Sequence, residues 1–242
     1  MLYLIGLGLN PPASLSREAL EAIRNSDVVF LEAYTGYVTE EEKKAIEKET
    51  GKKIQVMNRE IIESGSILPY AMKNNACLLV PGDPLAATTH ADLLLKAREK
   101  KIRFRVVHNS SILTAIGESG LQLYRFGRTS TIARWQKNFQ PTSFASAITD
   151  NQKANLHTLL LADTHEGMQP AEAMETLEKA CKAEGVALPE RLVICSKLGK
   201  EDATINYTSL EEAKKLEARL PFCIIVPAAL NTKEKELLDS IV

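Results

Sequence analysis

The sequence predicts an α/β protein built as two α/β lobes with mixed, largely parallel sheets. Short apolar segments rich in β-forming residues alternate with helical patterns, a rhythm typical of parallel strands joined by crossover helices. A polar, glycine-containing stretch over residues 118–128 interrupts this rhythm, and a second series follows it. The chain has 242 residues, which is longer than one typical domain. We therefore expect a first lobe over residues 1–112 and a second over residues 113–242.

Each expected strand is a short run of buried-type residues between turn residues. In the first lobe the runs are residues 2–5, 27–31, 53–57, 76–80 and 103–107. In the second lobe they are residues 129–133, 156–162, 191–196, 204–207 and 222–226.

Helix starts are marked by capping boxes, in which a polar first residue and a glutamate three positions later satisfy each other's backbone N–H groups. Such pairs begin at Thr39, Ser209 and Asn231. Residues 134–155 mix polar and aromatic residues and are expected to form an irregular surface segment that leads into a helix.

Composition excludes several classes of function. Thirty Lys and Arg against 31 Asp and Glu give a net charge of -1, too little positive charge for non-specific nucleic-acid binding. The four cysteines are isolated and without histidines at metal-ligand spacing, so no metal site is expected; most lie in apolar runs, which favours buried thiols in a reducing compartment. No apolar run approaches membrane-spanning length and no secretion signal precedes the first strand, so we expect a soluble, cytoplasmic protein.

The first candidate ligand motif is LIGLGLNPP, residues 4–12, where Gly6 and Gly8 follow an opening strand. A dinucleotide fingerprint would need a third glycine at the start of a helix, but Pro11 stands there, so NAD binding is disfavoured. Taken alone, the two glycines are equally compatible with a tight strand-to-helix turn.

Two further motifs also follow strands. Gly82 and Asp83 lie in the loop of LLVPGDPLAATTHADLL, residues 78–94, and such loops hold ligands in open α/β sheets. Asp83 could bind a ribose hydroxyl or merely cap the next helix. In HNSSI, residues 108–112, Ser110 or Ser111 could hold a polar ligand or serve as an N-cap. No nucleophile elbow, metal-spaced histidine pair or second carboxylate accompanies these motifs, so a hydrolytic mechanism lacks its residues.

Together, LIGLGL, DVVFLEAYTG, PGDPLAATTH, HNSSILTAIGESGLQLYRFGRT and LHTLLLAD, in this order and spacing, resemble the diphthine synthases. These enzymes belong to the tetrapyrrole-methylase-like, or class III, methyltransferases. The resemblance spans almost the whole chain. GDP after a strand is common to the larger group, whereas EAYT, PGDPLAATTH and GLQLYRFG are more specific.

The resemblance implies a homodimeric enzyme that binds S-adenosylmethionine in a cleft between its lobes. Its substrate would be translation elongation factor 2, methylated on the amino group of a 3-amino-3-carboxypropyl histidine to form diphthine in diphthamide biosynthesis. Matching positions assign cofactor contacts, mostly through the backbone, to Leu9, Asp83, Ala86, Ser111, Ile112, Ala162, Leu198 and Phe222.

The resemblance assigns no catalytic residue. We expect Glu32, Tyr34, Thr88 and His90 to position the acceptor arm, and keep open that Glu32 and His90 form a hydrogen-bonded structural pair. The number of methyl groups is also open: archaeal members are expected to stop at the trimethylamino product and eukaryotic ones to esterify a carboxylate as well, and the short chain favours the former.

Three other functions remain as alternatives. A tetrapyrrole or ribosomal RNA methyltransferase of the same fold is disfavoured by the specific motifs, and near-neutral charge further disfavours RNA. An NAD-linked dehydrogenase lacks its third glycine, although Glu32 supplies an acidic residue at the end of the second strand. A non-catalytic binding module would not bind S-adenosylmethionine.

Overall fold

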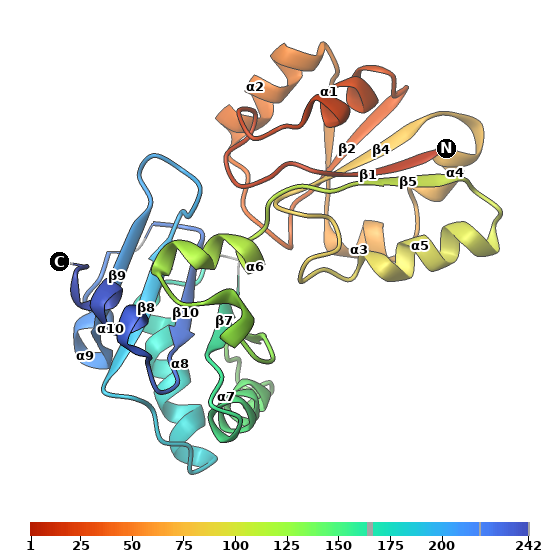
Figure 1. Ribbon diagram of the computed structural model, residues 1–242. Helices are drawn as coiled ribbons and strands as arrows, with labels where there is room; N and C mark the ends of the chain where they lie inside the picture. The colour runs from red at the N-terminus through yellow and green to blue at the C-terminus, as the bar shows by residue number, and fades with distance from the viewer. Residues whose placement is uncertain (164–166, 218, 242) are drawn as a thin grey trace. The chain divides into compact units, whose positions relative to one another are not determined.

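Ten strands form two five-stranded sheets in the computed structural model, which describes residues 1–163, 167–217 and 219–241 (Figure 1). Contacts divide the chain into an N-terminal unit, Met1–Leu113, and a C-terminal unit, Thr114–Val242. Pairings in the first sheet are all parallel and those in the second are mixed. The predicted fold class is therefore confirmed.

The sheet of the N-terminal unit has the strand order β3-β2-β4-β1-β5. The strands are β1 (Leu2–Gly6), β2 (Val28–Glu32), β3 (Ile54–Met57), β4 (Ala76–Val80) and β5 (Phe104–Val107). Because all of them are parallel, their carboxyl ends lie at the same edge, which brings the loops after β1, β2, β4 and β5 together. Each strand lies within a residue or two of its predicted range.

Helices cover both faces of this sheet, because alternate strand residues point to opposite faces and both sets are apolar. Leu4 and Leu78 pack toward α3, α4 and α5, whereas Ile5 and Leu79 pack toward α1 and α2. The helices are α1 (Arg17–Arg24), α2 (Glu40–Thr50), α3 (Arg59–Glu63), α4 (Leu68–Lys73) and α5 (His90–Glu99). The capping box at Thr39 is present at the start of α2.

The sheet of the C-terminal unit has the order β6-β7-β10-β8-β9, and only β6 and β7 are parallel among its described pairs. The strands are β6 (Ser130–Ile132), β7 (Thr158–Ala162), β8 (Arg191–Ser196), β9 (Thr204–Ser209) and β10 (Phe222–Val226). Strand β9 returns along β8 without an intervening helix, and this makes the sheet largely antiparallel.

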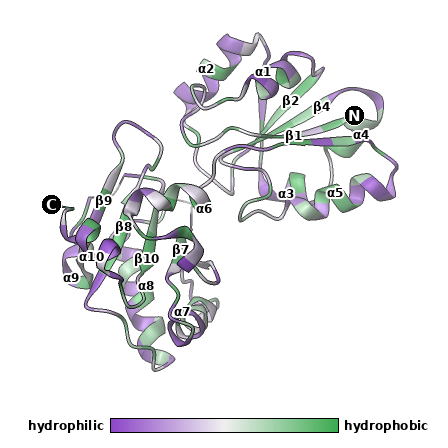
Figure 2. Ribbon diagram, in the orientation of Figure 1, coloured by the Kyte–Doolittle hydropathy of each residue, from purple (hydrophilic) through white to green (hydrophobic). Residues whose placement is uncertain are grey.

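Helices α7, α8 and α9 share one apolar core with this sheet, whose centre includes Phe144, Leu177 and Ile224. Figure 2 shows the apolar character of the central strands β4 and β10. The remaining elements are α6 (Ile112–Ala115), η1 (Ile116–Ser119), η2 (Leu123–Arg125), α7 (Ser143–Lys153), α8 (Pro170–Ala183), α9 (Leu210–Ala213) and α10 (Thr232–Asp239). The capping boxes at Ser209 and Asn231 are confirmed at α9 and α10.

The segment before α7 is irregular, as predicted. Gln136 and Phe139 form an isolated bridge there, and the Trp135 indole donates a hydrogen bond to the Pro141 carbonyl at 3.1 Å.

The four cysteines are free and buried, and burial raises the pKa of the Cys77 thiol to about 12 and that of Cys181 to about 11. Within the described ranges, every helix is too short or too polar to span a lipid bilayer.

Candidate active site

The three motifs singled out in the sequence meet at the carboxyl edge of the N-terminal sheet. Gly8 and Gly82 exchange backbone hydrogen bonds of 3.1 and 2.9 Å, and this joins the loop after β1 to the loop after β4. The Asn109 amide, just after β5, donates to the carbonyls of Gly6 and Ser14 at 3.0 and 2.9 Å. We call this arrangement of residues 6–14, 81–90 and 108–111 the strand-end site.

Close backbone packing explains the glycines of this site. A Cβ atom at Gly6 would lie 2.7 Å from the Gly82 carbonyl oxygen and 2.8 Å from the Asn109 Cβ, so no other residue fits without displacement. Gly8 and Gly82 both have φ of 70°, a left-handed conformation that glycine adopts without strain. Gly6 and Gly8 do not form a tight strand-to-helix turn, because α1 begins only at Arg17.

Asp83 is held by three hydrogen bonds. Its Oδ2 accepts from His108 Nδ1 at 2.8 Å and from the Asn109 backbone N–H at 3.1 Å, while Oδ1 accepts from the Leu85 N–H at 2.9 Å. Burial opposes ionisation, but these donors outweigh it and lower the pKa of the carboxyl. Asp83 does not cap α5, which begins seven residues later at His90. It is a fixed negative charge that ties the loop after β4 to the loop after β5.

The other predicted contacts of this unit lie close by in the chain. Leu9 follows the Gly8–Gly82 bridge and is half-buried, and the Ala86 backbone N–H donates to the Asp83 carbonyl. Ser111 is buried directly before α6, and Ile112 is the first residue of that helix. Asn109, which was not singled out, links all three motifs; an amide side chain directly after a strand was its only signal in the sequence.

At the end of the 81–90 segment, His90 joins Glu32 in a buried group of titratable side chains. Glu32 ends β2 and His90 begins α5, and each is 1% exposed. Glu32 Oε2 lies 3.9 Å from His90 Nε2, too far for a hydrogen bond. Glu32 instead accepts from the Thr35 hydroxyl and backbone N–H. The predicted hydrogen-bonded pair is therefore wrong in its geometry, although the two groups are neighbours.

Hydrogen bonds fix the tautomer of His90. Its Nδ1 lies 2.9 Å from the Pro84 carbonyl oxygen, which can only accept, so Nδ1 carries the proton. Burial lowers the pKa of this imidazole, and the neutral ring then offers Nε2 as an acceptor to the Tyr34 hydroxyl at 3.3 Å. The Thr88 hydroxyl donates to the same Pro84 carbonyl at 2.8 Å. Burial also raises the pKa of Glu32 to about 7.

A pocket of about 280 Å³ opens beside these groups. Its walls combine two carboxylates, a phenol and an imidazole with two aliphatic side chains. They are contributed by Tyr34, Ile62, Glu63, Thr89, His90, Asp92 and Leu93. The pocket lies wholly within the N-terminal unit, and Tyr34 connects it to the buried His90.

In the C-terminal unit the predicted contacts Ala162, Leu198 and Phe222 are all buried. Antiparallel pairing sets Phe222, the first residue of β10, opposite Ser196, the last residue of β8, and near the end of β7 at Ala162. Leu198 follows β8 by two residues, so the three positions gather at one end of this sheet. Within the described part of the chain, the Ser196 hydroxyl is the one buried side-chain oxygen or nitrogen without a hydrogen-bond partner.

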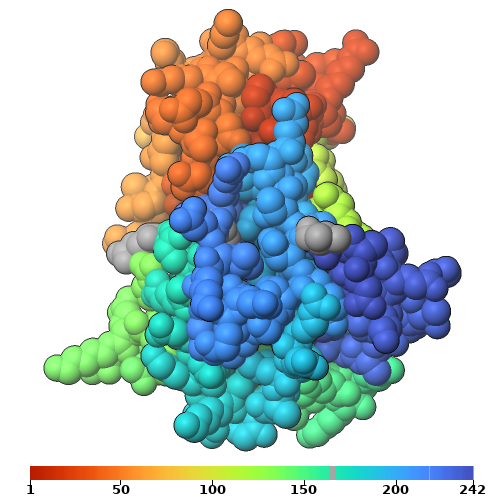
Figure 3. Space-filling model, turned by 90° about the vertical axis from the view of Figure 1, so that its left-hand side faces the viewer, coloured from red at the N-terminus to blue at the C-terminus, as the bar shows by residue number. Residues whose placement is uncertain are grey.

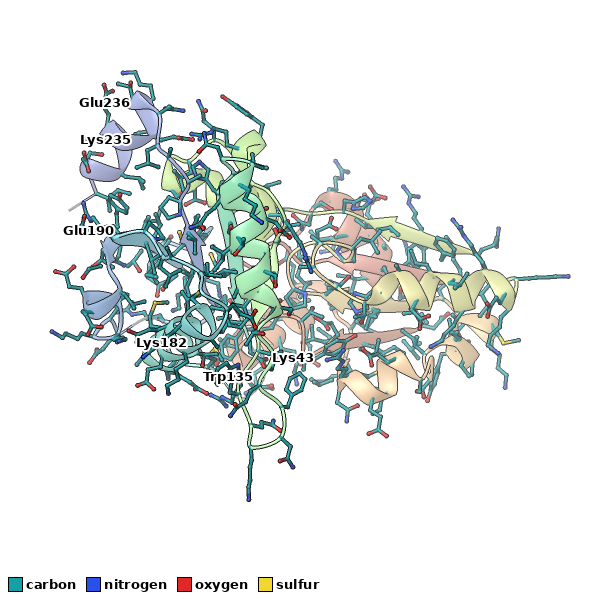
Figure 4. All side chains as sticks on the ribbon, turned by 90° about the horizontal axis from the view of Figure 1, so that it is seen from below. Lys43, Trp135, Lys182, Glu190, Lys235 and Glu236 are labelled. Carbon is teal, nitrogen blue, oxygen red and sulfur yellow. The ribbon has the colours of Figure 1, made fainter. Side chains whose placement is uncertain are left out.

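The C-terminal unit also has a buried cluster of charged side chains, which was not predicted. Glu234 on α10 accepts from His157 Nε2 at 3.1 Å, from the Arg125 guanidinium and from the backbone N–H groups of Gln122 and Asn231. Its neighbours Lys235 and Glu236 point outward from the helix (Figure 4), which lies at the surface in Figure 3 (dark blue). The capping box at Asn231 was the signal for Glu234, but nothing in the sequence linked it to His157.

Comparisons with known proteins identify the family. Residues 1–214 match the model of the tetrapyrrole (corrin/porphyrin) methylases. A diphthine methyl ester synthase of Schizosaccharomyces pombe is 34% identical over 98% of this chain and 92% of that protein. One of Candida glabrata is 43% identical over 72% of this chain, a match that spans 59% of the Candida protein.

A solved structure from Entamoeba histolytica, provisionally described as a diphthine synthase, superposes with a TM-score of 0.90 at 32% identity, covering 100% of this chain and 98% of that one. The family match extends over most of the chain, and the solved structure shares its fold. The chain belongs to the tetrapyrrole methylase family and, within it, to the diphthine synthases.

Proposed function

We propose that this protein transfers methyl groups from S-adenosylmethionine to the amino group of the 3-amino-3-carboxypropyl histidine of translation elongation factor 2, forming diphthine. The observation that carries the proposal is the strand-end site, in which three motifs typical of the diphthine synthases are hydrogen bonded to one another. Membership of the family supports the reaction class, and the names of the relatives support the substrate.

The residues present fit a nucleoside-type cofactor. The tightly packed glycines hold the loops after β1 and β4 together at one edge of the sheet, and Asp83 is fixed there as an acceptor for hydroxyl donors. Leu9, Ala86, Ser111 and Ile112 would contact it in the N-terminal unit, and the contacts predicted in the C-terminal unit are Ala162, Leu198 and Phe222. The unpartnered Ser196 hydroxyl beside Phe222 supports a polar ligand at that sheet end, because a buried hydroxyl without a partner costs roughly 1–3 kcal/mol.

When bound, the cofactor supplies an electrophilic methyl group on a sulfonium, so the protein mainly has to align the donor with the acceptor. Alignment alone can supply roughly 7–11 kcal/mol of barrier lowering. The Asp83 carboxylate, rigidly held by His108 and Asn109, would orient the donor. Glu32, Tyr34, Thr88 and His90 would position the acceptor arm. Thr88 and His90 share the Pro84 carbonyl, Tyr34 and His90 line the adjoining pocket, and Glu32 lies 3.9 Å from His90.

Three further features belong to the proposal. We expect the protein to work in the cytoplasm, where its substrate is found, and as a homodimer. The names of the fungal relatives favour an additional methyl ester over the trimethylamino product that chain length suggested. The other functions weighed, a tetrapyrrole or ribosomal RNA methyltransferase and an NAD-linked dehydrogenase, have no specific observation in their favour.

The test is calorimetric titration with S-adenosylmethionine, S-adenosylhomocysteine and NAD, followed by mass spectrometry of elongation factor 2 bearing the unmethylated arm. We expect binding of the first two ligands and stepwise gains of methyl mass, and the number of steps separates the trimethylated amine from the ester. Binding of NAD alone, or methylation of an RNA or a tetrapyrrole but not of the factor, would refute the proposal.

A further inference from the structure

Alignment of the methyl donor gives no role to the buried Glu32 and His90 or to Tyr34, which contacts His90. An α-amino group with a pKa of about 8 is mostly protonated at neutral pH, and an ammonium has no lone pair to attack a methyl group. A proton must therefore leave before each transfer. In this unit, Tyr34 and His90 line the same pocket and are hydrogen bonded to each other at 3.3 Å.

We infer that Tyr34 and His90 form a proton relay that deprotonates the acceptor amine; this inference rests on the proposed function. The Tyr34 oxygen accepts a proton from the substrate ammonium as the Tyr34 hydroxyl passes its own proton to Nε2 of His90. The N–H bond of the ammonium breaks, and the amine gains a free electron pair. That pair forms the N–CH₃ bond while the sulfonium S–CH₃ bond breaks and leaves a neutral sulfide, so one proton is released for each methyl transferred.

The orientation of His90 makes Nε2 the receiving atom. Its Nδ1 proton is held by the Pro84 carbonyl at 2.9 Å, so the ring cannot turn this nitrogen toward the pocket without losing the bond. The imidazole is neutral because burial lowers its pKa, so Nε2 keeps a lone pair that can take a proton. The same burial makes the ring a weaker base, which the neighbouring Glu32 carboxylate must offset. Pro84 also accepts from Thr88, which stiffens the loop that holds the ring.

Glu32 supplies the compensating charge in its ionised form, whose population grows as the pH rises through its pKa of about 7. Its Oε2 lies 3.9 Å from Nε2 of His90, and Thr35 holds both carboxylate oxygens in place. Protonation of His90 would bring the two groups into an imidazolium–carboxylate pair, in an environment where an isolated buried cation is costly. Regeneration requires His90 to return its proton through Tyr34 to the pocket and solvent before the next transfer.

Charged groups on the surrounding elements also act on the relay. Glu63 on α3 and Asp92 on α5 line the pocket and favour a cationic substrate. Arg59 on α3 lies 5.9 Å from the centre of the Tyr34 ring and pairs with Glu63 at 2.8 Å, and Lys96 pairs with Asp92 at 2.7 Å. Glu63 and Asp92, which face the pocket, are each paired with a cation of their own helix. Glu32, 3.9 Å from His90, has no ion pair with a Lys or Arg among the described residues.

The experiment compares Tyr34→Phe and His90→Gln with wild type and with the control Tyr37→Phe, a half-exposed tyrosine in the same segment. Single-turnover methylation of elongation factor 2 bearing the arm is followed from pH 6 to pH 10, about the range over which the amine loses its proton. S-adenosylhomocysteine binding is measured by calorimetry, and folding by circular dichroism.

We expect both variants to lose at least about 10²-fold in rate at pH 7, the lower end of general acid–base effects. The loss should shrink toward pH 10, where the amine is deprotonated without help, while S-adenosylhomocysteine affinity and the control remain at wild-type values. An equal loss at every pH, or no loss in either variant, would overturn the relay. If wild type itself does not methylate the factor, the proposed function fails instead. Should one variant not fold, the pH profile of the other decides.

Discussion

Among the described residues, each unit contains one buried glutamate beside one buried histidine, and the hydrogen bonds and ion pairs of the two glutamates differ. In the C-terminal unit, Glu234 and His157 are hydrogen bonded at 3.1 Å, and Arg125 and backbone N–H groups complete the shell of Glu234. In the N-terminal unit, Glu32 and His90 stand 3.9 Å apart, and the side chain that donates to Glu32 is that of Thr35.

The carboxyl pKa values record this difference. Burial opposes ionisation of Glu234, but its hydrogen bonds and the charge of its partners outweigh it and lower the pKa. For Glu32 burial dominates and raises the pKa to about 7. A buried hydrogen-bond network in which every polar group has a partner makes a structure more rigid. A buried ionisable group with few partners costs stability and has a shifted pKa, which is typical of functional sites. Glu234 therefore attaches α10 to its unit, and we infer that Glu32 is available for the proposed chemistry.

The largest expected effect is a contrast in stability between Glu234→Gln and Glu32→Gln. Removal of the Glu234 charge leaves the Arg125 guanidinium, whose side chain is 16% exposed, without its carboxylate, and we expect a loss of roughly 3 kcal/mol in the free energy of unfolding. Glu32→Gln should cause no loss at neutral pH, because the Glu32 carboxyl, with a pKa of about 7, is already partly protonated there and forms no Lys or Arg ion pair among the described residues. Denaturant unfolding measures both variants. Fluorescence of Trp135, the single tryptophan, reports on the C-terminal unit that contains Glu234, and circular dichroism also follows the N-terminal unit that contains Glu32. Equal losses would refute the distinction.

The next effect concerns the strand-end site. Gly6→Ala places a Cβ 2.7 Å from the Gly82 carbonyl oxygen, and overpacking of this kind costs roughly 1–3 kcal/mol. We also expect weaker binding of S-adenosylhomocysteine, measured by calorimetry, because the loops after β1 and β4 must separate. The matched control is Gly117→Ala in the C-terminal unit, where the nearest atom would be 3.5 Å away, an ordinary contact. Unchanged binding in Gly6→Ala would show that the ligand lies elsewhere.

The smallest effect is the pH dependence of stability. Glu32 has a folded pKa of about 7 against 4.5 for the free group, so its contribution is present below pH 4.5 and is lost as the pH rises through 7. The two buried histidines act oppositely: burial lowers their pKa below 6.5, so their contribution is present above pH 6.5 and is lost as the pH falls.

Glu32→Gln should therefore gain stability relative to wild type between pH 5 and pH 7, by at most about 1.4 kcal/mol per pH unit. Urea unfolding at several pH values measures this gain. The exposed Glu41→Gln on α2 serves as the control and should track wild type. A parallel shift of both variants at all pH values would contradict the raised pKa of Glu32.

The sequence by itself determined the local structure and the family. Short apolar runs between helical patterns located the ten strands, because a buried strand needs apolar side chains. A polar residue followed three positions later by a glutamate located the capping boxes at Thr39, Ser209 and Asn231. The order of strands and loops also placed Gly8, Gly82 and Asp83 at strand ends, where a parallel sheet gathers its ligand-binding loops.

Only the tertiary structure decided how these pieces meet. The direction of β8, β9 and β10 depends on long-range pairing that an apolar run does not encode, so the mostly antiparallel second sheet was not apparent. The hydrogen bond from Asn109 to Gly6 spans 103 residues, and those from His157 and Arg125 to Glu234 span 77 and 109. Such contacts set burial and hence pKa, which is why two Glu–His pairs that look alike as residue types have opposite properties in the folded chain.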